Sequence, residues 1–177
     1  FKTTSPSMDI LVSSNLERLL YHVTGSDTEV AALMKSLTET GSYTVRPETL
    51  RTIQESFACG WSSEEQVAGE IRARCEQDGY LCDTHTAVAF HVAAQHKRDG
   101  VPMVVLSTAS PFKFPRSVLE ALGQTAPAND FEAMQQLEEI TGRTAPASLS
   151  ALRRKAERFN TVIDPEQIAQ VALSYQA

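Results

Sequence analysis

The stretch Val101-Pro-Met-Val-Val-Leu-Ser-Thr-Ala-Ser-Pro-Phe-Lys-Phe-Pro115 contains the clearest strand signal in this chain. Its apolar run from Met103 to Leu106 is typical of a strand covered on both faces, because the apolar residues are continuous rather than alternating. The run ends at two hydroxyl residues, Ser107 and Thr108. Ligands of open α/β sheets bind at the carboxyl ends of the strands. A hydroxyl there either bonds to a ligand or satisfies the backbone of a turn.

Helical patterns dominate the rest of the chain. Ser26-Asp-Thr-Glu29 and Ser62-Ser-Glu-Glu65 have the form of capping boxes, and single glycines stand near the expected helix ends. Asp83 is placed to cap a helix that begins at Thr84. A brief strand is expected at 43–45. Further helices are expected over about 16–24, 27–40, 47–59, 64–78, 116–122, 130–141, 148–159 and 165–173.

A sheet needs several strands, and this chain offers one clear strand among many helices. The unpaired edges of that strand would be exposed if the chain stood alone. We therefore expect an α/β fold that is rich in helices, has few strands and contains only part of its sheet. The alternative is a self-contained helical module.

Composition narrows the class of protein. The chain has 177 residues, which suits one domain or part of a larger one, and a net charge of −6 with no dense basic stripe, which argues against nucleic acid as a partner. No run of about 18 apolar residues predicts a membrane span. Cys59, Cys75 and Cys82 lack the spacing of a metal site, and we expect structural thiols in a reducing cytoplasm.

Three stretches resemble, in the same order, motifs of the threonine synthase family, whose members are pyridoxal-phosphate enzymes of fold type II. Lys2-Thr-Thr-Ser-Pro-Ser-Met-Asp-Ile-Leu-Val-Ser-Ser-Asn-Leu-Glu-Arg18 resembles the segment "SPSMDI…SSNFER". Asp83-Thr-His-Thr-Ala-Val-Ala89 resembles "DPHTAV", with Thr84 where proline is usual. Ser107-Thr-Ala-Ser-Pro-Phe-Lys-Phe114 resembles the C-terminal motif of the family.

The resemblance implies that the chain is the C-terminal part of such an enzyme. Residues 1–115 would belong to the cofactor-binding core, and residues 116–177, where no motif matches, would form a C-terminal helical region. The lysine that binds the cofactor and the glycine-rich phosphate loop lie upstream in the family, and Lys2 belongs to a different motif. The missing N-terminal part is therefore the expected partner, and the isolated chain is expected to be inactive and to hold no catalytic residue.

The resemblance also assigns roles to single residues. Thr108 would contact the pyridine nitrogen of pyridoxal phosphate, and Ser107 would also bind the cofactor. His85 would lie near the mouth of the active site, and Arg18 and Lys113 would meet the substrate phosphate, since cations grip phosphate through charge-assisted hydrogen bonds. From the residues alone, His85 is equally a packing residue at a helix start, and Arg18 a surface arginine. No metal site is expected.

The implied reaction converts O-phospho-L-homoserine and water to L-threonine and phosphate, as a carbon–oxygen lyase acting on phosphates. Two alternatives stay open. One is a phospho-lyase similar to threonine synthase that acts on another phosphorylated amino compound. The other is a non-catalytic helical module for protein interaction or ligand sensing.

Overall fold

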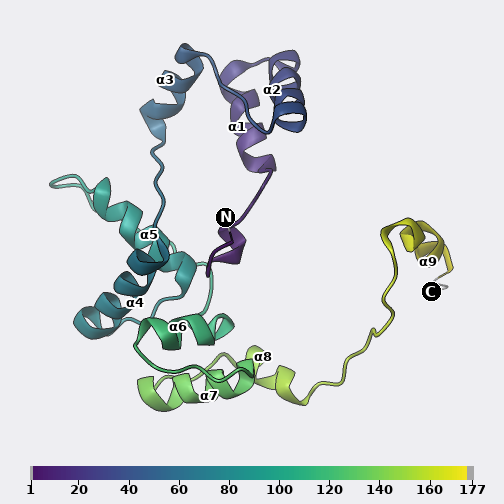
Figure 1. Ribbon diagram of the computed structural model, residues 1–177. Coiled ribbons are helices and arrows are strands. Elements are labelled where there is room, and N and C mark those ends of the chain that lie inside the picture. The colour runs from purple at the N-terminus through teal and green to yellow at the C-terminus, as the bar shows by residue number, and fades with distance from the viewer. Residues whose placement is uncertain (1, 175–177) are drawn as a thin grey trace. The chain divides into compact units, whose positions relative to one another are not determined.

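The computed structural model describes residues 2–174, and all the regular structure assigned in this range is helical (Figure 1). The chain divides into two compact units at Thr144–Ala145, and each is described by itself. The first unit contains η1 (Pro6–Met8), α1 (Ser14–Thr24), α2 (Asp27–Thr40), α3 (Pro47–Ser56), α4 (Glu64–Asp78), α5 (Thr84–Gln95), η2 (Pro111–Lys113), α6 (Pro115–Ala121) and α7 (Asp130–Thr141). The second contains α8 (Ala147–Ser150), η3 (Ala151–Arg154), η4 (Pro165–Gln167) and α9 (Ile168–Ser174).

The helices of the first unit begin and end where local signals place them. The Ser26 side chain accepts a hydrogen bond from the Glu29 amide, and Asp83 caps α5 as expected. The capping box of α4 forms one residue later than expected, between Ser63 and Gln66, because the Gln66 side chain returns to the Ser63 amide. Gly79 ends α4 in the left-handed region with φ of 62°, which a glycine adopts without strain.

The core of the first unit lies where α4 packs against α5 and α6, and where α6 packs against α7. Helix α1 also contacts α2 and α3. Arg72 of α4 donates two hydrogen bonds to the Ala121 carbonyl at the end of α6, with N···O distances of 3.2 and 2.9 Å. A cation at a helix C-terminus opposes the negative end of the helix dipole. The fully buried apolar side chains include Ile71, Val118, Leu119 and Leu137.

The prediction of a strand at Met103–Leu106 was wrong. Residues 101–108 form no regular structure, and the short strand expected at 43–45 is also absent. The side chains of the run are exposed, at 44% for Met103, 76% for Val104 and 75% for Leu106. A strand is defined by its ladder of backbone hydrogen bonds, and no described residue supplies a partner for one. The helix-rich character is confirmed, whereas the described residues contain no part of a sheet.

The prediction of a basic helix in the second unit was also wrong. The basic helix expected over 148–159 is reduced to the single turns of α8 and η3, and residues 155–164 are irregular apart from a bend. Leu152 and Phe159 are exposed at 48% and 72%, so the apolar face has nothing to pack on within the unit. A short helix without such packing is only marginally stable in water. The expected C-terminal helix is confirmed as η4 and α9.

The unit boundary at Thr144–Ala145 differs from the division expected after residue 115, because α6 and α7 pack into the first unit. That division concerned the cofactor-binding core of a larger enzyme and stays a prediction. No helix within residues 2–174 is long and apolar enough to cross a membrane.

Candidate functional site

The three motifs meet at the N-terminus of α5, around Asp83. This carboxylate is fully buried. One oxygen, Oδ1, accepts hydrogen bonds from the backbone amides of His85 and Thr86, at 2.9 and 3.3 Å. Oδ1 also lies 3.2 Å from His85 Nδ1, and Oδ2 accepts the Thr86 hydroxyl. These donors, together with the positive end of the helix dipole, stabilise the negative charge without a lysine or arginine.

His85 joins this carboxylate to the N-terminal motif. Its Nε2 accepts a hydrogen bond from the Ser7 amide at 3.0 Å, so the proton of the neutral ring is on Nδ1 and is donated to Asp83. Its ring centroid lies 4.7 Å from that of Phe114, in the third motif. His85 is 6% exposed, and both ring nitrogens bond to the protein. In this arrangement the side chain orders its neighbours and has no nitrogen left for a ligand.

Thr86 joins the same carboxylate to the third motif. Its Oγ1 lies 3.2 Å from Ser107 Oγ. A hydroxyl has one proton, and Thr86 Oγ1 is in donor geometry toward both Asp83 Oδ2 and Ser107 Oγ, so the carboxylate and Ser107 share this donor. The next residue, Thr108, is exposed, and its hydroxyl bonds to none of the described residues. The Thr108 hydroxyl is therefore free to bond to a ligand.

The N-terminal segment is held from two sides. Thr84 donates its hydroxyl proton to the carbonyl of Thr4 at 2.9 Å, and Thr4 donates its own hydroxyl proton to Glu64 at 2.6 Å. Thr3 donates its amide and its hydroxyl to Asp9, both at 2.8 Å. The bond from the Thr3 amide, followed by that from its hydroxyl, lowers the pKa of Asp9.

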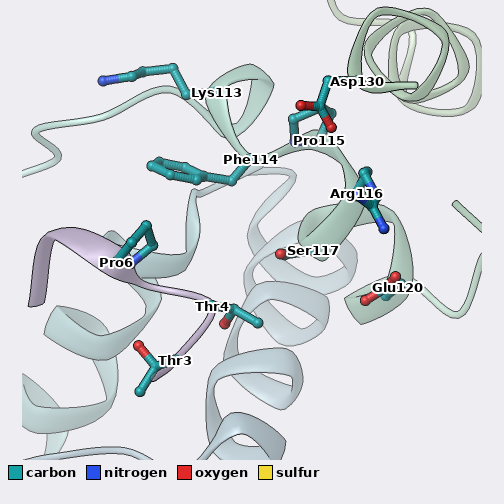
Figure 2. A pocket seen from close by; sticks show the side chains of 10 residues that line it. All are labelled: Thr3, Thr4, Pro6, Lys113, Phe114, Pro115, Arg116, Ser117, Glu120 and Asp130. Carbon is teal, nitrogen blue, oxygen red and sulfur yellow. The ribbon is translucent and has the colours of Figure 1, made fainter. Parts of the chain in front are cut away.

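Lys113 lines a polar hollow of about 420 Å³ beside this segment (Figure 2). Its Nζ lies 6.0 Å from the centroid of the Phe114 ring, a cation–π contact. Figure 2 shows the side chains of Lys113 and Arg116 directed to different sides of the hollow. The hollow thus combines hydroxyls with charges of both signs. It is lined by Thr3, Thr4, Pro6, Lys113, Phe114, Pro115, Arg116, Ser117, Glu120 and Asp130.

Arg18 lies in another hollow, of about 490 Å³, which is lined by residues of α1 and α2. Its Nη2 donates to Asn15 Oδ1 at 2.6 Å and its Nε donates to the Ser14 carbonyl at 3.4 Å. None of the residues lining this hollow lines the one that contains Lys113. The described residues therefore bring His85, Ser107 and Thr108 together and leave Arg18 apart from Lys113.

Asp83 and Thr86 were not singled out as site residues from the sequence. The signal that could have found Thr86 is its position three residues after the cap, where a side chain reaches back to the capping residue. The thiol of Cys82, next to Asp83, is fully buried, and burial followed by the charge of Asp83 raises its pKa to about 12. No cluster of three or more His, Cys, Asp or Glu side chains in residues 2–174 is suited to a metal ion.

Comparison with known proteins points in one direction. Residues 86–172 match the sequence model of a family described as "Threonine synthase, C-terminal". A threonine synthase of Pseudomonas aeruginosa is 35% identical over 170 residues, which cover 94% of this chain and 32% of that protein.

Two solved structures agree. The crystal structure of a threonine synthase from Brucella melitensis with pyridoxal phosphate bound has a TM-score of 0.67 and 34% identity, covering 88% of this chain and 35% of that one. Yeast threonine synthase has a TM-score of 0.75 over 98% of this chain and 36% of that one, and its 24% identity supports the fold alone. The chain spans about a third of the length of the relatives it matches.

Proposed function

Because this chain belongs to the threonine synthase family, we propose that it works as the C-terminal part of a pyridoxal-phosphate enzyme of fold type II that converts O-phospho-L-homoserine and water to L-threonine and phosphate. The residues present fit the cofactor in one respect that the chain itself supplies. A hydroxyl with no other partner stands at Thr108, beside a serine that Thr86 holds in place. That free hydroxyl is the observation that carries the proposal.

Bound pyridoxal phosphate withdraws electrons from the substrate carbons, and this allows proton removal, loss of phosphate and addition of water. The part of Thr108 is to hydrogen-bond to the pyridine nitrogen. A hydroxyl, unlike a carboxylate, leaves that nitrogen without a full positive charge. Ser107, held by Thr86, keeps the backbone at Thr108 in place.

The exposed run before Thr108 is the surface on which the rest of the enzyme would pack. Met103, Val104 and Leu106 are each at least 44% exposed in a segment whose sequence is typical of a buried strand. Burial of apolar side chains is favourable at about 25 cal/mol per Å². We propose that strands of the N-terminal part pair with this run and cover it.

The substrate phosphate would be met by Lys113 or by Arg18, which are both exposed and line separate hollows. Lys113 has no ion pair with any described residue, and Arg18 is oriented by Asn15. His85 would act on the substrate site indirectly. It would hold the Ser7 amide and thereby fix the position of the N-terminal turn η1. The three cysteines are unpaired, as is usual in the reducing cytoplasm, where we propose the enzyme works.

The test replaces Thr108 in the intact enzyme. In Thr108→Val the ring nitrogen loses a hydrogen bond worth about 0.5–1.5 kcal/mol, so the Kd of pyridoxal phosphate should rise by about 2- to 10-fold with a changed cofactor absorbance. Thr108→Ser should retain the wild-type values. Thr125→Val, at an exposed threonine outside the site, is the matched control.

Two results would oppose the proposal. One is a Thr108→Val enzyme whose cofactor affinity, absorbance and turnover equal those of the wild type. The other is an intact wild-type enzyme that releases no phosphate from O-phospho-L-homoserine, which would favour a related phospho-lyase if it acts on another phosphorylated amino compound.

A further inference from the structure

We propose that Asp83 is a positioning residue that fixes two separate walls of the cofactor site through His85 and Thr86. One wall is the η1 turn, reached through the Ser7 amide, and the other is the segment of Ser107. The inference concerns the geometry around Asp83, and its second half rests on the proposed role of Thr108.

Asp83 makes more hydrogen bonds than a helix cap requires. Asn129 provides the comparison, because it caps α7 by accepting from the amides of Phe131 and Glu132 at 2.9 and 3.2 Å. Asp83 accepts the equivalent pair of amides at 2.9 and 3.3 Å. It then accepts two side-chain donors as well, and it is fully buried.

The two side-chain donors connect Asp83 to distant segments of the chain. His85 donates to the carboxylate through Nδ1 and leaves Nε2 as the acceptor for Ser7, which lies 78 residues earlier in the chain. The Thr86 hydroxyl is the donor toward both the carboxylate and Ser107, which lies 21 residues later. The carboxylate therefore accepts from both side chains that reach the distant segments, and it favours the Nδ1–H tautomer of His85 that the hydrogen bond from the Ser7 amide also requires.

The carboxylate at position 83 accepts hydrogen bonds only, and this polarity matters for Thr86. An amide in place of the carboxylate would donate to Thr86 Oγ1 instead of accepting from it. The Thr86 proton would then have only Ser107 as its acceptor, and the bond to a charged group that orients the hydroxyl would be lost. A serine at position 83 would still cap α5, since serine caps about as well as aspartate, but it is too short to reach either side chain.

The experiment uses the pyridoxal-phosphate-loaded enzyme that contains this chain. Its histidines are labelled with ¹⁵N, and the His85 signals are assigned by their loss in His85→Gln. We expect wild-type His85 to be the single Nδ1–H tautomer. In Asp83→Ser it should become a mixture of tautomers, while the control Asn129→Ser leaves His85 unchanged. A single Nδ1–H tautomer in folded Asp83→Ser would overturn the role of the carboxylate.

The second arm uses Thr86. Thr86→Val keeps the shape of the side chain and removes its hydroxyl, and it should alter the cofactor absorbance and lower kcat by about 10-fold, the effect of one hydrogen bond to a charged group. KM should stay within about 2-fold, because no substrate contact is changed. Thr86→Ser should restore the absorbance and kcat, which a general loss of stability would not explain.

The outcomes separate this inference from the proposed function. Wild-type absorbance and kcat in Thr86→Val would overturn the link from Asp83 to the cofactor wall. An enzyme that binds no pyridoxal phosphate would overturn the proposed function and, with it, that link. The tautomer of His85 does not depend on the cofactor, so its change in Asp83→Ser would still support the wall formed by η1.

Discussion

Thr84 offers a quantitative test of how α5 begins. The sequence has threonine where the family motif usually has proline, at the first residue of α5. Proline suits this position, because the amide there has no acceptor within the helix and the preceding Asp83 is extended, with φ −83° and ψ 170°. The threonine supplies something that proline lacks, namely the hydroxyl that donates to the Thr4 carbonyl at 2.9 Å.

The free energies follow from these contacts. Thr84→Val keeps the volume of a side chain that is 1% exposed and leaves the Thr4 carbonyl without its donor, which should lower the free energy of unfolding by about 1–2 kcal/mol. Thr84→Pro loses the same bond, but it restricts the unfolded chain and recovers about 0.4–1 kcal/mol. Thr84→Ser keeps the bond and loses one methyl group, at about 0.8 kcal/mol.

The assay is urea unfolding of the four proteins followed by far-UV circular dichroism. We expect Thr84→Pro to be more stable than Thr84→Val, and wild type to be the most stable. If Thr84→Pro is the least stable by more than about 1 kcal/mol, the backbone at the start of α5 is not compatible with proline and the reasoning fails. If Thr84→Val equals wild type, the contact with Thr4 contributes nothing.

Four further predictions concern other parts of the chain. A thiol reagent at pH 8 should label the exposed Cys59 in the native protein and Cys82 only after denaturation. Burial raises the pKa of Cys82 from 9.0 to about 12, so the folded state favours the neutral thiol. The resulting contribution to the free energy of unfolding is fully present below pH 9 and is lost as the pH rises from 9 to 12. Denaturation measured against pH, with Cys82→Ala as the reference, tests this. Leu137→Ala, at a fully buried site on α7, should lower the free energy of unfolding by about 2–5 kcal/mol. Ile140→Ala, at a site on the same helix that is 45% exposed, should lower it by less than about 1.5 kcal/mol. Equal losses in the two variants would refute this packing of α7. Arg18→Ala in the intact enzyme should raise KM for the phosphorylated substrate by about 10-fold, because a charge-assisted contact is lost; an unchanged KM would return Arg18 to a helix surface.

The helix boundaries were largely predictable because their signals are local. Asp83 at the start of α5 and Gly79 at the end of α4 act on amides and carbonyls within one turn. The basic helix expected up to Phe159 was wrong because its apolar face finds no partner within the second unit, and helical periodicity alone does not supply one.

The expected strand at Met103–Leu106 shows the same limit in another form. Its continuous apolar run is a property of the sequence, whereas a strand also needs a neighbour for its amides and carbonyls. Residues 2–174 offer no such neighbour, so the run is exposed and without regular structure. The continuous apolar run therefore indicates that Met103–Leu106 needs covering and pairing partners, and it does not by itself provide them.

By itself, the sequence determined the three motifs, their order, the caps of most helices and the family to which the chain belongs. The tertiary structure alone decided that these motifs share one buried carboxylate, with His85 turned to Ser7 and Thr86 turned to Ser107. It also decided that Arg18 and Lys113 line two different hollows. The physical reason is that caps and periodicity act over a few residues, whereas contacts 78 and 21 residues apart depend on the packing of whole helices.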